Sequence, residues 1–277
     1  MSELSAMSLA LPLILLVWFS HRYAWWRPAV SWHRPRILMY HMVQPLRAGA
    51  KFNGLRVTPE RFEAQVRWLR EQGFRFYTVS ELWAQWDRLP ERAVAITFDD
   101  GYADNLHYAL PILERYDAKA TIYVVVDRHD RDWSTYKKVH HNSGELAREA
   151  KLDDEEVRQL AASGRIEIGS HTLTHCNLGT TPEDAKRHEL QASREQLESL
   201  ISMPVRSFAY PFGIYSRDDI RLARETGYET AVTTVEGIDE LDPRPEPLDL
   251  QRVKVSGKDN QLAFVMKMRG GRRGWRK

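Results

Sequence analysis

The stretch Ala93-Val94-Ala95-Ile96-Thr97-Phe98-Asp99-Asp100-Gly101 joins a short apolar run to two adjacent carboxylates and a glycine. A short, mostly apolar run that is bounded by a turn signal is typical of a buried strand. Asp99 and Asp100 therefore follow the carboxyl end of a predicted strand. Parallel α/β barrels build their active sites at this end of their strands, so the two acids are candidate active-site residues.

Strand-like runs alternate with amphipathic helices on both sides of this stretch. One predicted helix has Thr58 as its N-cap and Pro59 at its first position, and it stops at Gly73. The alternation predicts βαβ units and a parallel sheet, and about seven strands favour a barrel over an open sheet. The other strands are expected at Ile37–Tyr40, Phe74–Val79, Ala120–Val126, Arg165–Gly169, Val205–Tyr210 and Glu229–Thr234. The other helices are expected at Asn105–Tyr116, Asp154–Ala162, Pro182–Leu200 and Arg217–Thr226.

Two more motifs end predicted strands, namely SHTLTH at residues 170–175 and FAYPFG at residues 208–213. His171 and His175 are four residues apart, and with one carboxylate they form a three-ligand site that leaves a coordination position open for water. The expected ligands are Asp100, His171 and His175. Asp99 and Asp100 cannot both point at the same ion from an extended strand end, so one is expected to bind the metal and the other to take a proton from the bound water.

Composition and charge limit the class of protein. The chain has 277 residues, 43% hydrophobic and 28% charged, and a single cysteine, Cys176, which excludes a disulfide-stapled mini-protein. Ten of the 40 basic residues lie in residues 20–36 and 267–277, where there is no acid. The middle of the chain is therefore acidic overall, so no nucleic-acid partner is expected.

The N-terminal segment contains the apolar run Leu9–Phe19, followed by tryptophans and arginines. Residues 1–36 are interpreted as a hydrophobic membrane segment with a basic aromatic flank, which spans only if it recruits further residues or thins the bilayer. A cleaved signal peptide and a core-facing helix are the alternatives. Residues 257–277 are interpreted as a basic tail. Because the positive charge follows the apolar run, the body is expected on the cytoplasmic side of the inner membrane.

The three motifs together resemble those of the polysaccharide deacetylase family, the NodB-homology carbohydrate esterases, and the resemblance covers roughly residues 37–256. It implies a distorted (β/α)₇ barrel, a divalent metal, most often Zn²⁺, and hydrolysis of an N-acetyl group from an amino sugar. It also implies that Asp99 is the base, that Asp100, His171 and His175 are the ligands, and that the backbone N–H of Phe212 stabilises the oxyanion.

The chain departs from the family pattern at two places. Many members carry an arginine where this chain has Ala209, and Arg252 in the LQRVKV segment is a candidate to supply that positive charge. Many members also carry a late histidine as general acid, whereas the last histidine here is His188. His41, at the end of the first predicted strand, is either an acid, a substrate contact or a structural histidine.

The remaining candidates have both a functional and a structural interpretation. Tyr102 and Tyr210 either line the sugar site or pack in the core. Cys176 is expected to be a buried thiol and not a fourth ligand. The aperiodic segment Asp127–Lys151, with His140 and His141, is either a solvated loop or a cover for the active site.

The expected substrate is an acetylated amino sugar in an envelope glycan. The membrane surface contacted by the two ends favours a lipid-linked acceptor, such as a lipopolysaccharide core or a carrier-lipid sugar. Exopolysaccharide or peptidoglycan is the alternative with the same chemistry. A non-catalytic glycan-binding barrel and an amidase with a non-sugar substrate also remain open.

Overall fold

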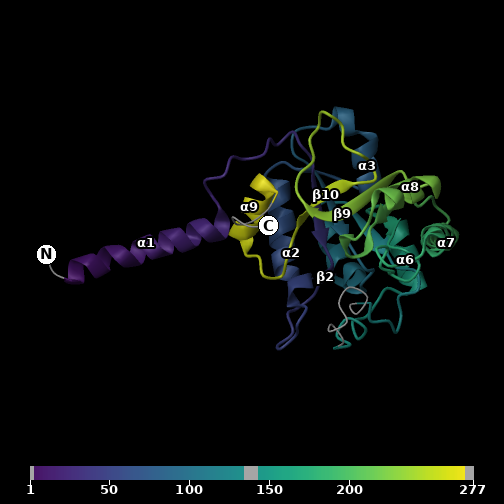
Figure 1. The fold of residues 1–277 in the computed structure, drawn as a ribbon, viewed down its shortest axis with the longest axis horizontal. Helices are drawn as coiled ribbons and strands as arrows, with labels where there is room; N and C mark the ends of the chain where they lie inside the picture. Colours follow the sequence, from purple (N-terminus) through teal and green to yellow (C-terminus); the bar gives the residue numbers. More distant parts are fainter. Residues whose placement is uncertain (1–2, 134–142, 272–277) are drawn as a thin grey trace.

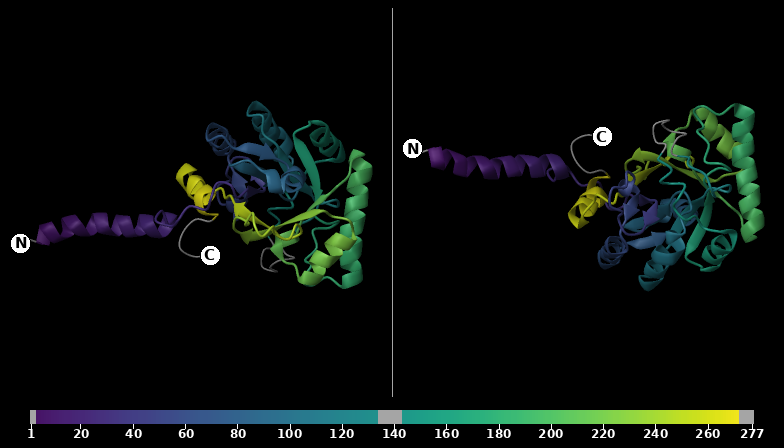
Figure 2. Two further views of the ribbon diagram at one scale, coloured as in Figure 1. Left: turned by 90° about the horizontal axis from the view of Figure 1, so that it is seen from above. Right: turned by 90° about the horizontal axis from the view of Figure 1, so that it is seen from below.

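Seven parallel strands form a closed barrel in the computed structural model, which describes residues 3–133 and 143–271. Strand β1 (Arg36–Tyr40) pairs with β10 on one edge and with β5 on the other, and this closes the ring. Around the barrel from β1 the order is β10 (Leu250–Lys254), β9 (Thr230–Glu236), β8 (Ser207–Ala209), β7 (Ile166–Ser170), β6 (Ala120–Val124) and β5 (Ala93–Phe98). The two end views show the ring of strands with helices around it (Figure 2). The expected distorted (β/α)₇ barrel is confirmed.

One of the seven barrel strands is not the one expected from the sequence. The predicted strand Phe74–Val79 is reduced to β4 (Arg75–Tyr77), which pairs with the first residues of β5 on the edge that β6 uses further along. The seventh barrel strand is instead β10, which was not predicted as a strand. Its inward residue Arg252 is charged, so the segment lacks the apolar pattern by which the other strands were found.

Helices cover the outside of the barrel (Figure 1). The α-helices are α1 (Glu3–Tyr23), α2 (Pro59–Glu71), α3 (Val79–Ala84), α4 (Leu110–Arg115), α6 (Asp154–Ala162), α7 (Glu183–Ile201), α8 (Arg217–Glu225) and α9 (Gln261–Gly270). Shorter turns are η1 (Asn53–Leu55), η2 (Trp86–Arg88), the π-helical η3 (Asn105–Ala109) and η4 (Pro211–Gly213). A small second sheet pairs β2 (Met42–Val43) with β3 (Arg56–Val57).

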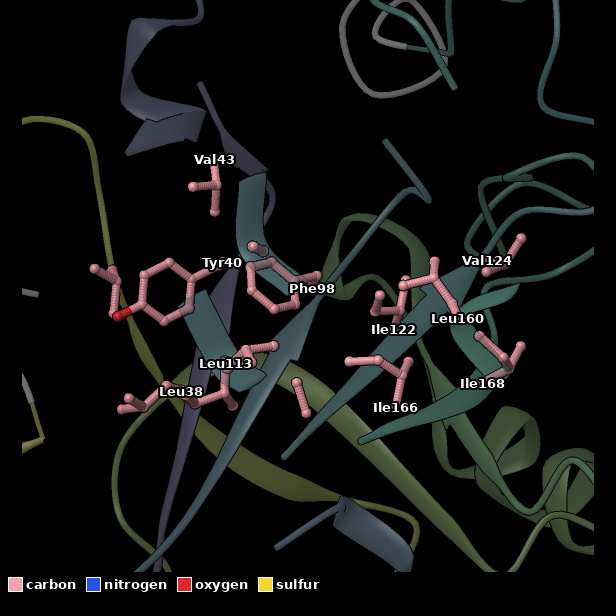
Figure 3. Close-up of a cluster of buried hydrophobic side chains, with 14 of the residues drawn as sticks. Leu38, Tyr40, Val43, Phe98, Leu113, Ile122, Val124, Leu160, Ile166 and Ile168 are labelled. Carbon is pink, nitrogen blue, oxygen red and sulfur yellow. The ribbon is translucent and has the colours of Figure 1, made fainter. Parts of the chain in front are cut away.

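Alternation along each strand separates two hydrophobic cores. Outward residues such as Leu38, Phe98 and Ile122 pack under the helices in the larger core (Figure 3). Inward residues such as Ala95, Tyr123 and Val232 fill the barrel, whose amino-terminal end is closed by apolar residues of α3 and the following turn. Residues that directly follow the carboxyl ends of the strands and also point inward therefore face the same region at that end of the barrel.

The last residue of α1 and the start of α9 lie together on one side of the barrel. Helix α1 projects from the body, with Leu13, Leu16 and Trp18 more than half exposed (Figure 1). At its end, Asn260 donates a hydrogen bond of 3.1 Å to the hydroxyl of Tyr23. Among the residues that the structure describes, no helix is both long enough and apolar enough to cross a membrane. The expected membrane segment is therefore not supported by the structure.

Several basic residues of the two ends belong to the folded body. The sequence placed residues 257–277 in a tail, but residues 261–270 form α9, and its Phe264 packs edge-on against Trp68 of α2. Lys267 is 6% exposed and forms an ion pair of 2.6 Å with Asp259. Arg36 is fully buried and donates hydrogen bonds to backbone carbonyls. Arg272, Arg273, Arg276 and Lys277 lie outside the described residues.

A substitution inside the barrel tests this packing. A Cβ at Gly169 would lie 2.5 Å from Cδ1 of Tyr123 and 2.9 Å from the carbonyl oxygen of Ser207. We expect Gly169→Ala to lower the free energy of unfolding by about 1–3 kcal/mol, because overpacking forces neighbours to move. Urea denaturation measures the loss, with Gly270→Ala as control, since nothing lies within 4 Å of that Cβ. Equal stability of the two variants would contradict the packing.

Candidate active site

Asp99 and Arg252 form a buried bidentate ion pair at the carboxyl end of the barrel. The two Asp99 carboxylate oxygens each lie 2.7 Å from a terminal nitrogen of Arg252. The same guanidinium donates to the carbonyl oxygen of Thr233 at 2.7 Å and to Oγ1 of Thr97 at 3.0 Å. Burial raises the pKa of Asp99, whereas the charge and the hydrogen bonds of Arg252 lower it. The lowering effects are larger in sum, so the net pKa lies below its usual value. Asp99 is therefore held ionised and in a fixed orientation.

Asp100, His171 and His175 converge beside this pair. Oδ1 of Asp100 lies 3.4 Å from Nε2 of His171 and 3.3 Å from Nε2 of His175. The three residues are buried, and their ligand atoms lie within 4.8 Å of one another. Two ligands each about 2.1 Å from a tetrahedral zinc ion are about 3.4 Å apart. The residues and their spacing thus fit a divalent metal with an open position.

The two histidines are oriented in different ways. Nδ1 of His171 lies 2.7 Å from the carbonyl oxygen of Ala209, so it donates there and leaves Nε2 free to bind a metal. Nδ1 of His175 has no hydrogen-bond partner among the described residues. Its ring instead contacts the rings of Trp133, Phe212 and His171. Burial lowers the pKa of His175 to about 4, against the opposing effect of Asp100, so the ring is neutral at neutral pH.

The backbone around the cluster is unusual. Asp100, Thr172, His175 and Phe212 all have positive φ, at 78°, 69°, 57° and 60°. This region is uncommon for residues other than glycine, and such conformations gather at functional sites. The turns that follow β5, β7 and β8, which carry the ligand candidates and Phe212, therefore hold local backbone strain.

His41 lies next to the two acids, at the point where β1 ends. Asn105 donates a hydrogen bond of 3.0 Å to the His41 carbonyl oxygen and so fixes the position of its backbone. Burial lowers the pKa of His41, while the charges of Asp100 and Asp99 act in the opposite direction. The imidazole is therefore neutral near pH 7 and close enough to the acids to respond to their charge.

Phe212 lies in η4, directly after β8 and Tyr210. Its ring meets the His175 ring edge-on, with centroids 4.4 Å apart. Its carbonyl oxygen accepts a hydrogen bond of 3.5 Å from Oγ1 of Thr234. The turn that carries the expected oxyanion donor is therefore in contact with a metal-ligand candidate.

The structure gives four other candidates structural positions. Tyr210 faces the outer core, where its hydroxyl donates 2.9 Å to the carbonyl oxygen of Leu248, so the expected substrate contact is not available to it. Tyr102 is fully buried, and Arg252 is buried against Asp99, so neither presents a surface to a sugar in this structure. Cys176 is buried outside the ligand cluster, as expected, and burial raises the pKa of its thiol to about 12.

Two residues of the aperiodic segment 127–151 reach the site, and the sequence did not single them out. Trp133 is 1% exposed and stacks on His175, with centroids 4.9 Å apart and planes at 27°. Lys151 is 8% exposed, and burial lowers its pKa to about 8. The length of the segment was the only signal, because neither residue belongs to a periodic pattern. His140 and His141 lie outside the described residues.

A double-variant cycle tests the ion pair. We expect Arg252→Met to lower the free energy of unfolding by about 3–5 kcal/mol, because it leaves a buried carboxylate without its partner. Adding Asp99→Asn should recover part of that loss, since the charge is then gone. Urea denaturation of the four proteins measures the coupling.

Arg36→Met is the matched control, because Arg36 is also fully buried but bonds to carbonyl oxygens. Asp99→Asn should not rescue it. Additive losses from Arg252→Met and Asp99→Asn would contradict the assigned pairing.

Comparison with known proteins gives a consistent result. The sequence model described as polysaccharide deacetylase matches residues 87–231. A protein of Bacillus subtilis assigned to the polysaccharide deacetylases is 34% identical over 232 residues, which are 82% of this chain and 74% of that protein. The poly-β-1,6-N-acetyl-D-glucosamine N-deacetylase of Staphylococcus epidermidis is 22% identical over 240 residues, which are 82% of this chain and 78% of that one.

Solved structures have the same fold. A polysaccharide deacetylase of Bacillus cereus superposes with a TM-score of 0.72 at 26% identity, over 85% of this chain and 69% of that chain. A deacetylase of Streptococcus pyogenes in complex with acetate superposes with a TM-score of 0.67 at 25% identity, over 83% of this chain and 94% of that chain.

Proposed function

The chain belongs to the polysaccharide deacetylase family, and we propose that it removes N-acetyl groups from an amino sugar of a cell-envelope glycan with a divalent metal at Asp100, His171 and His175. The observation that carries this proposal is the buried ligand cluster next to an ionised, immobilised carboxylate. The family assignment supports the hydrolase chemistry. The neutral His175 and the anionic Asp100 support zinc as the metal.

The residues of the site divide the work of amide hydrolysis. A bound zinc ion would supply a more acidic water and polarise the acetamide carbonyl. Asp99 accepts the proton of the attacking water, since Arg252 keeps it ionised and in a fixed orientation. The backbone N–H of Phe212 donates to the acetyl oxygen as negative charge develops there.

His41 is the proposed source of the proton that the leaving amine requires. The neutral imidazole takes up the proton that Asp99 accepted from the water, and Asp99 and Asp100 stabilise the imidazolium transiently. Its lowered pKa then makes the imidazolium a strong donor to the amine nitrogen. The chain has no histidine after His188, so no late histidine competes for this role.

The proposed substrate is an acetylated amino sugar carried on a lipid, such as a lipopolysaccharide core or a carrier-lipid sugar. The exposed apolar surface of α1 supports this choice, because an enzyme held at a membrane surface meets lipid-anchored acceptors more often. The Staphylococcus epidermidis relative is named for a poly-β-1,6-N-acetyl-D-glucosamine substrate, so this polymer is the alternative acceptor.

Acetate release tests the activity directly. Zinc-loaded protein is expected to release acetate from an acetylated aminoglycan, and Asp99→Asn to lower kcat by about 10²–10⁴-fold, because general-base assistance is lost. Chelation should abolish release, and added Zn²⁺ should restore it. Short β-1,6-linked N-acetylglucosamine oligomers and a lipid-linked N-acetylglucosamine are the two substrates that distinguish the acceptors.

Glu155→Gln is the control variant, because this acid is 80% exposed at the side chain and only pairs with Arg158 on the surface. It should retain full activity. If wild type and Asp99→Asn release the same small amount of acetate from both substrates, the proposed function is wrong and a glycan-binding barrel becomes the better reading.

The N-terminal helix is the proposed membrane contact, with the body on the cytoplasmic side. Leu13, Leu16 and Trp18 expose apolar surface, and Arg22 follows at the end of the helix, next to the tryptophans Trp25 and Trp26. Apolar and aromatic side chains next to arginine suit the headgroup region of an anionic membrane.

Vesicle flotation tests the membrane contact. The wild-type chain is expected to float with vesicles that contain phosphatidylglycerol, and the triple variant Leu13→Ser, Leu16→Ser, Trp18→Ser to stay in solution. Tyr108→Ser, which removes an exposed aromatic of the barrel helices, should float like the wild type. Equal flotation of the triple variant, or no flotation of the wild type, would contradict the membrane contact.

A further inference from the structure

Among the residues that the structure describes, His175 finds no partner for the hydrogen bond that normally orients a metal-binding histidine. Such residues usually donate their second ring nitrogen to a carbonyl or carboxylate, and His171 does so to Ala209. Nδ1 of His175 is buried without a hydrogen-bond partner among the described residues. The orientation of its ring therefore depends on the side chains packed against it.

Trp133 is the residue that covers the face of this imidazole. Its ring is stacked on His175, whereas Phe212 and His171 meet His175 through edges, at 89° and 74°. Trp133 is almost fully buried, but its Nε1 also has no hydrogen-bond partner within the described part of the chain. Within the described part of the chain, the indole is consequently held by packing and by charge.

Lys151 supplies that charge. Its Nζ lies 4.9 Å from the centroid of the Trp133 ring and 4.4 Å from that of Tyr102, the residue two positions after Asp100. Two of its donors are used by the carbonyl oxygens of Leu146 and Glu149, at 2.8 and 3.1 Å. A desolvated ammonium against aromatic faces forms strong cation–π contacts.

The segment that carries Lys151 is itself fixed to the small sheet. Arg56 of β3 is fully buried and binds Glu145 and Glu149 at 2.8 and 2.7 Å. Gln44 donates a further 2.8 Å hydrogen bond to Glu149. Lys151 also forms a backbone bridge with Tyr102. The ammonium thus has a defined position relative to the turn that carries Asp100.

We propose that Lys151 is a positioning residue of the metal site, which holds Trp133 against His175 and thereby sets the orientation of this ligand. The role rests on the proposed metal-dependent function. Lys151 and the Trp133 ring orient His175, as the carbonyl oxygen of Ala209 orients His171. No contact of Lys151 with the substrate is required.

Metal affinity tests this role without reference to turnover. Zn²⁺ affinity is measured by competition with a chromogenic chelator, and the visible absorption spectrum of the Co²⁺ form reports the ligand geometry. Lys151→Met, which keeps the length of the side chain but removes the charge, is expected to bind Zn²⁺ about 10–100-fold more weakly and to alter the Co²⁺ spectrum. Lys151→Arg keeps a cation over the rings and should retain most of the affinity.

Two further variants separate positioning from loss of stability. Lys267→Met removes another buried ammonium, 6% exposed and paired with Asp259, so it should destabilise the fold but leave Zn²⁺ affinity unchanged. Trp133→Leu should weaken Zn²⁺ binding like Lys151→Met, and it decides the question if that variant does not fold. Because Lys151 acts through Trp133, the double variant should bind Zn²⁺ no more weakly than Trp133→Leu alone.

Unchanged Zn²⁺ affinity and an unchanged Co²⁺ spectrum in Lys151→Met would overturn the proposal, as would additive losses in the double variant. A wild-type chain that binds no Zn²⁺ would contradict the proposed function itself, and with it this role. The two failures are therefore distinguishable.

Discussion

The buried ion pair between Asp99 and Arg252 is the interaction on which the active site depends. It joins the end of β5 to β10, the strands on either side of β1, and the same guanidinium binds a carbonyl of β9. A charge in this position is stable only with its partner, because removing one member of a buried pair leaves the other unsolvated. The pair therefore both fixes the strand ends and keeps Asp99 ionised. The neighbouring Asp100 is then free to face the two histidines.

Much of the fold and the ligand set could be predicted from the sequence, because both follow from the alternation of strand-like and helical segments along the chain. The strands β1, β5, β6, β7, β8 and β9 overlap the expected ranges, and the carboxyl ends of β5, β7 and β8 carry the motifs. Strand β10 was missed because Arg252 interrupts its apolar pattern. Helix α9 was missed for a similar reason, since Lys267 reads as a surface charge but pairs with Asp259 in the interior.

The remaining site residues depend on contacts that no local pattern encodes. Arg252 meets Asp99 from 153 positions away in the sequence, so its partner was only a hypothesis before the structure. Successive side chains of a strand point to opposite faces. Because Ala209 points into the barrel, the side chain of the next residue, Tyr210, points into the outer core. Trp133 and Lys151 reach the site from a segment without secondary-structure periodicity. Its ion pairs with Arg56 are long-range and invisible in the sequence.

The central claim is that Asp100, His171 and His175 bind one divalent metal. Anomalous diffraction at the zinc absorption edge, from crystals grown with Zn²⁺, tests it most directly. We expect one strong anomalous peak about 2.0–2.2 Å from an Asp100 oxygen and from Nε2 of both histidines. A peak elsewhere in the barrel, or none at these three residues, would contradict it.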